Sequence, residues 1–240
     1  PINCYYYLRF GITDHGEDTM FEGIKQLEAG KYAIIKTNSE NKTISHHEHW
    51  KEKIEKGKYE NVSQVISDFK SKFYESISLH LRSDVEVGVA LSGGVDSSAI
   101  ALGVRALYPD RNIHAFSFVA NDSLSSEESW IDLIGKKGNL KVHKIVPNPE
   151  ELRHQFEETI YGEDQPSGDF GIFPQHCVSK LAQDNGIKVL LSGDGGDELF
   201  GGYTGYAAAR AASLLRSCQL LEYYKFKNKC SKLPGRSNLQ

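Results

Sequence analysis

Short apolar runs alternate with segments of helical periodicity along most of this sequence, and this alternation restricts the fold more than any other feature. Strands are predicted where β-branched and other apolar residues cluster, at residues 85–91, 113–119, 140–146 and 187–191. Helices are predicted beside them, at residues 62–81, 97–108, 125–137, 149–161 and 174–185. Short strands that alternate with helices predict an α/β fold with a doubly wound parallel sheet.

The first 56 residues follow a different pattern. Two alternating segments, residues 31–37 and 42–50, surround a polar turn cluster and predict a small β-hairpin. The charged run at residues 51–58, KEKIEKGK, is typical of a linker. With 240 residues, of which 39% are hydrophobic and 25% charged, the chain is long enough for one or two domains with a sizeable core. We therefore expect a small unit at residues 1–56 and a larger one at residues 57–240.

Composition argues against several classes of partner. The formal net charge is −4 and the pI near 6.2, so no basic footprint indicates nucleic acid. No apolar run approaches the roughly 18 to 20 residues that span a bilayer. No membrane association is expected, and the polar first residues lack a signal-peptide core, which favours a cytoplasmic protein. The four cysteines show no CxxC pairing and no metal-ligand spacing, so neither a zinc site nor a disulfide framework is indicated. They are therefore expected to be reduced thiols: Cys4, Cys177, Cys218 and Cys230.

The segment LSGGVDSS, residues 91–98, follows the first predicted strand of the sheet and opens a helix. Its two glycines allow backbone N–H groups to approach a ligand, and its serines add hydroxyl donors. Together with the positive end of the helix dipole, they predict an anion cradle for a phosphate. The segment is not a Walker A loop, because no lysine follows. Asp96 would repel a phosphate unless a cation neutralised it, and Mg²⁺ bridging carboxylate and phosphate oxygens fits this need.

The segment LLSGDGGDELFGGY, residues 190–203, concentrates carboxylates among glycines directly after the last predicted strand. In a parallel sheet this loop lies at the same edge as Asp96. A second carboxylate facing Asp96 would complete a magnesium site that holds a polyphosphate from both sides. A solvated acidic turn would not explain the surrounding glycines, whereas close backbone approach to a ligand does. The two segments together predict one site.

These segments resemble the signatures of a known family. LSGGVDSS is similar to the PP-loop of N-type ATP pyrophosphatases, and LLSGDGGDELFGGY to the second signature of their asparagine synthetase branch, over residues 58–206. The upstream stretch YYYLRFG…TMFEGIKQLEAGKYAII resembles the last part of the glutaminase domain of glutamine-dependent members. The resemblance implies a PP-loop (adenine nucleotide α-hydrolase-like) fold. It also implies that residues 1–56 are the C-terminal remnant of an Ntn-type glutamine amidotransferase domain, and residues 57–240 a synthetase domain truncated at its C-terminus.

The resemblance also implies a reaction, in which aspartate is adenylated by ATP and then amidated to asparagine, with glutamine or ammonia as nitrogen donor. AMP and pyrophosphate leave, and β-aspartyl-AMP is the intermediate. Asp96 and Asp197 correspond to the family's Mg²⁺ ligands, and Asp194 and Asp96 to its catalytic acids. The positions that correspond to contacts with the pyrophosphate portion of ATP are Ser92, Gly93, Gly94, Asp96, Ser97 and Ser98. Those that border the adenosine are Leu91, Phe118 and Gly193.

Two departures from the family pattern shape the expectations. A glutamine-dependent relative begins with a cysteine nucleophile, but this chain begins Pro-Ile-Asn-Cys, so Cys4 is not expected to be that nucleophile. A lysine in the family's C-terminal helices stabilises the adenylation transition state, and Lys225, Lys227 and Lys229 are poor substitutes for it. The chain is therefore interpreted as a fragment. A relative that forms a β-lactam or another amide, and a non-catalytic nucleotide-binding module, stay open as alternatives, as does a homodimer.

Other polar clusters have simpler explanations. His46 and His47 point to opposite faces of a strand, so a metal site with His49 is not expected. Glu127 is a candidate nucleotide neighbour, because acids near the start of this helix lie close to the nucleotide in relatives. In the loop at residues 162–174, Asp164 and Ser167 are candidates for contact with the second substrate, with an ordinary surface loop as the alternative.

Overall fold

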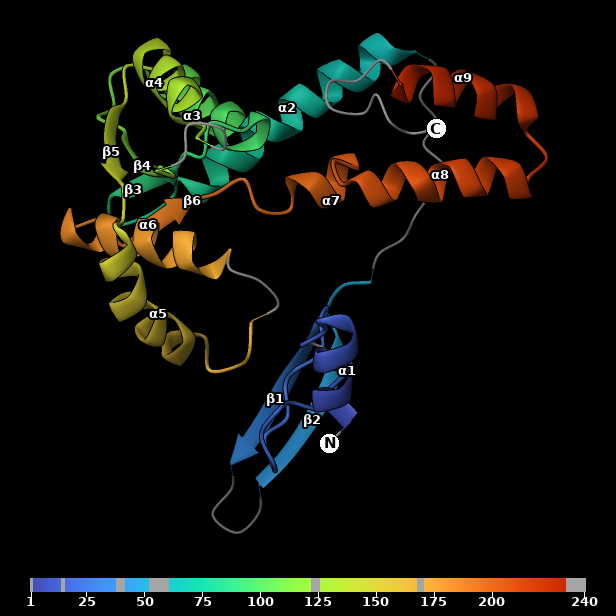
Figure 1. Cartoon of the computed structure of the whole chain (residues 1–240), viewed down its shortest axis with the longest axis horizontal. Helices are drawn as coiled ribbons and strands as arrows, with labels where there is room; N and C mark the ends of the chain where they lie inside the picture. Colours follow the sequence, from blue (N-terminus) through green and yellow to red (C-terminus); the bar gives the residue numbers. More distant parts are fainter. Residues whose placement is uncertain are drawn as a thin grey trace.

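The computed structural model describes residues 2–13, 16–37, 42–51, 61–121, 126–167 and 171–231. Its centre is a four-stranded sheet, and every strand pair in it is parallel (Figure 1). The strands are β3 (Val87–Ala90), β4 (His114–Phe118), β5 (Lys141–Ile145) and β6 (Val189–Leu191), in the order β5-β4-β3-β6. Each lies within a predicted strand segment, so the predicted α/β fold with a parallel sheet is confirmed.

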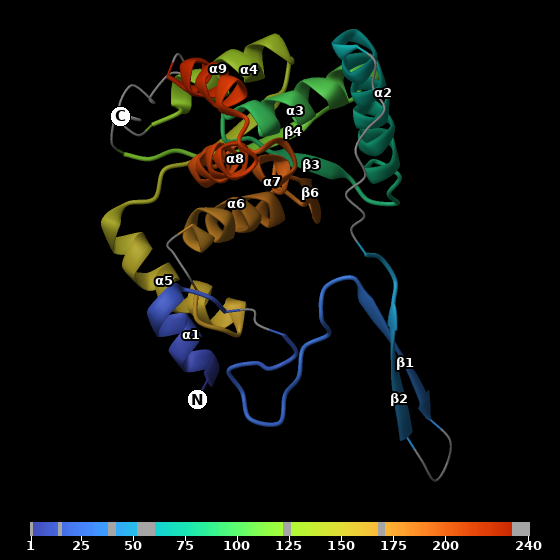
Figure 2. The same cartoon turned by 90° about the vertical axis from the view of Figure 1, so that its right-hand side faces the viewer.

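Helices cover both faces of this sheet, as Figures 1 and 2 show. One face carries α2 (Val62–His80), α3 (Val95–Leu107) and α4 (Glu128–Lys137). The other carries α6 (Ile172–Asp184), with α5 (Pro149–Glu163) packed against it. The start of α2 is fixed by Asn61, whose side chain accepts a hydrogen bond from the amide of Gln64 at 2.8 Å. This two-sided arrangement is the doubly wound layout that the alternation predicts.

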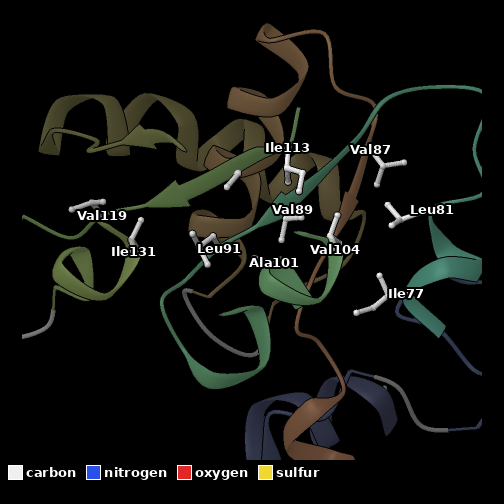
Figure 3. Close-up of a cluster of buried hydrophobic side chains, with 11 residues drawn as sticks. Ile77, Leu81, Val87, Val89, Leu91, Ala101, Val104, Ile113, Val119 and Ile131 are labelled. Carbon is white, nitrogen blue, oxygen red and sulfur yellow. The ribbon is translucent and has the colours of Figure 1, made fainter. Parts of the chain in front are cut away.

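A core cluster lies on each face of the sheet. The larger one joins the sheet to α2, α3 and α4, and includes Val89, Ala101, Ile113 and Ile131 (Figure 3). A Cβ at Gly103 would lie 2.5 Å from Cδ1 of Ile77, so this glycine is what allows α2 and α3 to approach so closely. On the other face, Phe116 packs against Ala182 and Ile187. Each fully buried large apolar side chain contributes about 1.5 to 3 kcal/mol, which stabilises the sheet that carries these loops.

Three helices follow β6 that the sequence pattern did not predict as regular elements. They are α7 (Gly196–Phe200), α8 (Thr204–Arg216) and α9 (Leu220–Cys230). The last two pack on each other around a turn at Cys218, which has a left-handed φ of 55°. Lys225, Lys227 and Lys229 all lie on α9.

The N-terminal part consists of α1 (Ile2–Phe10) and an antiparallel hairpin of β1 (Lys31–Thr37) and β2 (Lys42–Glu48). The hairpin is confirmed, while its turn at residues 38–41 and the linker residues 52–60 lie outside the described residues. Figures 1 and 2 show the hairpin standing away from the α/β layers. The Tyr7 hydroxyl of α1 donates to the carbonyl oxygen of Ser167 at 2.9 Å, which ties this part to the loop after α5. No helix within the described ranges is long and apolar enough to cross a membrane.

The stability of the sheet is expected to depend on pH through His143 of β5. Its ring stacks on Phe116 with centroids 4.8 Å apart, and its Nε2 lies 3.2 Å from Nδ1 of His114. Burial, followed by the neighbouring His114 and Lys141, lowers the pKa of His143 below the ordinary value of 6.5. Just below pH 6.5 the unfolded chain therefore binds more protons than the folded chain. The free energy of unfolding should fall as pH decreases through this window, and the fall should end below the folded-state pKa.

Thermal unfolding between about pH 7.5 and 5.5 measures this effect. His143→Phe keeps an aromatic ring on Phe116 but cannot titrate, so its melting temperature should fall less steeply with pH. His46→Phe, at an exposed position on β2, is the matched control and should follow the wild-type curve. Equal slopes for wild type and His143→Phe would show that His143 has no part in the pH dependence.

Candidate active site

A cavity of about 950 Å³ lies where the carboxyl ends of the strands meet α6 and α7. The loops after β3, β4 and β6 line it on one side and the first half of α6 on the other. Its lining residues include Leu91, Ser92, Gly94, Asp96, Ser97, Phe116, Phe118, Glu127, Gln175, Val178, Ser179, Ser192, Gly193, Asp194 and Asp197. Both chemically unusual segments of the sequence therefore open into one cavity.

The loop after β3 turns sharply into α3. Gly93 has a left-handed φ of 86°, which side chains rarely adopt, and Gly94 is the N-cap of α3. The Ser92 hydroxyl accepts a hydrogen bond from the amide of Gly94 at 3.2 Å and lies 3.0 Å from the Ser97 hydroxyl. The first turn of α3 thus faces the cavity with its amides and the positive end of its dipole, which favours an anion.

Asp96 joins this loop to the acidic segment after β6. A Cβ on Gly196 would lie 2.6 Å from both Cγ and Oδ2 of Asp96. A Cβ on Gly193 would lie 3.0 Å from Cβ of Asp96 and 3.0 Å from the amide nitrogen of Ser97. Only bare backbone fits at these two positions. The glycines of the second segment thus allow its backbone to pack on the carboxylate of the first.

The acids of the second segment have separate surroundings. The Ser192 hydroxyl donates to Oδ2 of Asp194 at 2.7 Å, which orients that carboxylate at the cavity wall. Asp197 lies in the first turn of α7, and a Cβ on Gly202 would overlap its carboxylate. Glu198 accepts a hydrogen bond from the hydroxyl of Tyr203 at 3.0 Å, which raises the pKa of Tyr203. Asp194 and Asp197 line the cavity, whereas Glu198 is engaged outside it.

Most of the predicted site residues line this cavity. They are Leu91, Ser92, Gly94, Asp96, Ser97, Phe118, Gly193, Asp194 and Asp197. Gly93 and Ser98 are not among the lining residues. Gly93 packs against the start of α4, because a Cβ on Gly93 would lie 3.2 Å from the carbonyl oxygen of Glu127. The buried Ser98 hydroxyl has no hydrogen-bond partner among the described residues.

One wall of the cavity was missed by the sequence reasoning. Gln175, Val178 and Ser179 of α6 line it at spacings of three and four residues, as one helix face does. The periodicity was a usable signal, but it did not reveal which face of α6 meets the sheet edge. Glu127, a candidate from the sequence, does line the cavity, while Glu128 pairs with Lys144 at 2.8 Å.

The residues present fit a divalent cation only together with ligand oxygens. Within the described part of the chain, no three His, Cys, Asp or Glu side chains gather closely enough to hold a metal ion by themselves. Asp96 and Asp197 both line the cavity and provide hard oxygen donors, and phosphate oxygens and water normally complete such a Mg²⁺ site. In the hairpin, the ring of His47 stacks on Tyr32 with centroids 5.1 Å apart, as in ordinary cross-strand packing.

Asp164 and Ser167 lie elsewhere. They line a separate pocket of about 760 Å³ together with Tyr7, Phe21 and Ile160. Neither is among the residues that line the larger cavity. Asp164 and Ser167 therefore lie beside the N-terminal region and not in the cavity that Asp96 and Asp194 line.

The parallel sheet, the glycine-rich turn into α3 and the acidic loop packed on it define a PP-loop-like α/β domain. The asparagine synthase family model matches residues 68–235, which is most of the chain. The chain therefore belongs to the asparagine synthase family.

Among the similar curated proteins are two named as asparagine synthetases and one named as an amidase. The chain is 28% identical over 202 residues to a putative glutamine-hydrolysing asparagine synthetase 2 of Methanocaldococcus jannaschii, covering 84% of the chain and 38% of that protein. It is 28% identical over 188 residues to the glutamine-hydrolysing asparagine synthetase 1 of Bacillus subtilis, covering 78% and 29%. It is 25% identical over 211 residues to amidase chry2 of Gibberella zeae, covering 79% and 30%. The chain thus spans well under half the length of each of these relatives.

Proposed function

We propose that this chain forms the nucleotide-binding part of an ATP-dependent ligase that converts aspartate to asparagine. The observation that carries the proposal is the contact between the two motifs, in which the backbone of Gly193 and Gly196 packs on Asp96. Two acids from distant segments, Asp96 and Asp197, thereby border one cavity beside a helix N-terminus. A bound polyphosphate with a cation satisfies this combination of negative side chains and positive backbone.

The nucleotide would lie along the loop from Leu91 to Ser98. The amides of the first turn of α3 and the hydroxyls of Ser92, Ser97 and Ser98 would hold the pyrophosphate portion of ATP. Leu91, Phe118 and Gly193 would border the adenosine, beside the α6 wall. Asp96 and Asp197 would hold Mg²⁺, which neutralises phosphate charge when bound.

In the proposed reaction a carboxylate oxygen of aspartate attacks the α-phosphorus of ATP, and the bond to the bridging oxygen of pyrophosphate breaks. Ammonia then attacks the acyl carbon of the resulting β-aspartyl-AMP, loses a proton, and AMP leaves. Asp194, oriented by Ser192, would position the substrate or accept the proton of the amine. The contribution of the chain is mainly positioning and charge neutralisation.

The N-terminal part supports a role for glutamine as nitrogen donor. We interpret residues 1–56 as the end of a glutaminase domain and residues 57–240 as synthetase. The hydrogen bond from the Tyr7 hydroxyl to the carbonyl oxygen of Ser167 joins these two parts. The relatives named as glutamine-hydrolysing synthetases support the same arrangement.

A second candidate is amide formation on a different carboxylic acid. The similarity to a protein named amidase favours keeping it, because that protein matches 79% of the chain with 25% identity. The motif residues do not distinguish the two acids, since they handle the nucleotide and the reacting carboxylate in the same way.

Product analysis tests the proposal. A protein that contains these residues and spans the length of the relatives is incubated with ATP, Mg²⁺, aspartate and ammonia, and AMP, pyrophosphate and asparagine are quantified. Equal amounts of all three are expected. Formation of ADP and phosphate would contradict adenylation, and AMP formation with another acid but not with aspartate would favour the second candidate. The 240-residue chain itself should bind ATP in the presence of Mg²⁺.

A further inference from the structure

Ser117 is a polar residue in a position that packing alone would fill with an apolar one. It lies on β4 between Ala115 and Val119, both members of the core cluster on the α3 side of the sheet. Its exposed fraction is 0%, the same as that of Ala115. A hydroxyl in such a place costs free energy unless it is hydrogen-bonded, so its partner indicates what it does there.

That partner is the backbone at the start of the loop that enters the cavity. The Ser117 hydroxyl donates to the carbonyl oxygen of Leu91 at 2.7 Å, across 26 residues of sequence. Leu91 comes directly after β3, and its amide donates to the carbonyl oxygen of Phe116 at 2.8 Å. The sheet thus holds Leu91 from both its amide and its carbonyl group, at the last point before the chain leaves β3.

The carbonyl group of Leu91 and the amide of Ser92 belong to one planar peptide unit. The amide of Ser92 donates to the Ser97 hydroxyl at 3.2 Å, and that hydroxyl lies 3.0 Å from the hydroxyl of Ser92. Ser117 therefore fixes one end of this peptide plane while Ser97 fixes the other. Rotation of the plane would move the hydroxyl of Ser92, which accepts from the amide of Gly94 at the N-cap of α3.

We propose that Ser117 is a positioning residue for the loop at residues 92–98, acting through the peptide plane between Leu91 and Ser92. Its importance for nucleotide binding rests on the function proposed above. Ser117 is not among the cavity-lining residues, so it acts without contact to a ligand. Without its hydroxyl, the peptide plane loses one of its two anchors and the donors of the loop are no longer held toward the cavity.

Ser117→Ala, measured in the 240-residue chain, tests this role. Exchange of the Ser92 amide hydrogen, followed by NMR, should become about tenfold faster, corresponding to roughly 1.4 kcal/mol. The Kd for ATP with Mg²⁺ should rise by about the same factor. Ser117→Thr retains the hydroxyl and should restore both values toward those of the wild type.

Thr159→Val is the matched control. Thr159 is also buried and its hydroxyl also donates to a backbone carbonyl, that of Gln155 at 2.8 Å, but within α5. The Thr159→Val variant should have a lower melting temperature, as Ser117→Ala does. The exchange rate of the Ser92 amide hydrogen and the Kd for ATP should stay unchanged. Unchanged exchange of the Ser92 amide in Ser117→Ala would overturn the positioning role. A wild-type chain that does not bind ATP would instead contradict the proposed function, while the exchange measurement would still decide the role of Ser117.

Discussion

Asp96→Asn is expected to reduce AMP formation by at least about a hundredfold while the chain stays folded. The change replaces a carboxylate by an amide, so it removes one negative charge and one cation ligand without changing the size of the side chain. Because Asp96 fits against the backbone of Gly193 and Gly196, an isosteric change keeps this packing intact. A cation held by carboxylates supplies several kcal/mol of charge stabilisation in the transition state, which corresponds to this factor.

The assay uses the protein that spans the length of the relatives, as in the product analysis. AMP and pyrophosphate are quantified over a range of Mg²⁺ concentrations, and the melting temperature is measured in parallel. Asp184→Asn is the control, because it makes the same chemical change at the exposed end of α6, away from the cavity. It should behave as the wild type. An Asp96→Asn variant that retains full activity with the same Mg²⁺ dependence would remove Asp96 from the cation site.

The sheet and its covering helices were predictable from local pattern, because each strand is a short apolar run between polar turns. Val87 to Ala90 and His114 to Phe118 both fall inside such runs. The helix α7 was not, since the glycines that surround Asp197 indicate a loop when only propensity is considered. Packing on Asp96 decides the conformation there, and this contact involves residues about a hundred positions apart.

The site was predictable to the extent that its residues sit at strand ends. Asp96 and Asp194 follow β3 and β6, and neighbouring parallel strands bring their carboxyl ends to one edge. Gln175 and Ser179 could not be assigned in this way, because a helix face reaches the site only through the rotation of α6 on the sheet. Ser117 was likewise invisible as a site residue, since its effect passes through a hydrogen bond to the backbone of Leu91.

Gly196→Ala is expected to weaken ATP binding by roughly ten- to a hundredfold and to have little effect on the fold. Gly196 is the first residue of α7 and its φ is not positive, so the backbone itself accepts alanine. Alanine would even favour the helix by about 0.5 to 1 kcal/mol. The new methyl group, however, would lie 2.6 Å from Cγ and Oδ2 of Asp96. The carboxylate or α7 must therefore move, and the two motifs separate.

Calorimetric titration with ATP and Mg²⁺ measures this, and Gly205→Ala is the control because a Cβ there has no atom within 4 Å. Both variants add one methyl group to a first helical turn, so a difference between them isolates the contact with Asp96. The contact is tested further in an Asp96→Ala background, where Gly196→Ala no longer meets a carboxylate. Any loss of melting temperature that Gly196→Ala causes in the wild type should disappear there, because the two changes are coupled. An equal loss in both backgrounds would mean that the glycine serves α7 alone and that the motifs are not held together by Asp96.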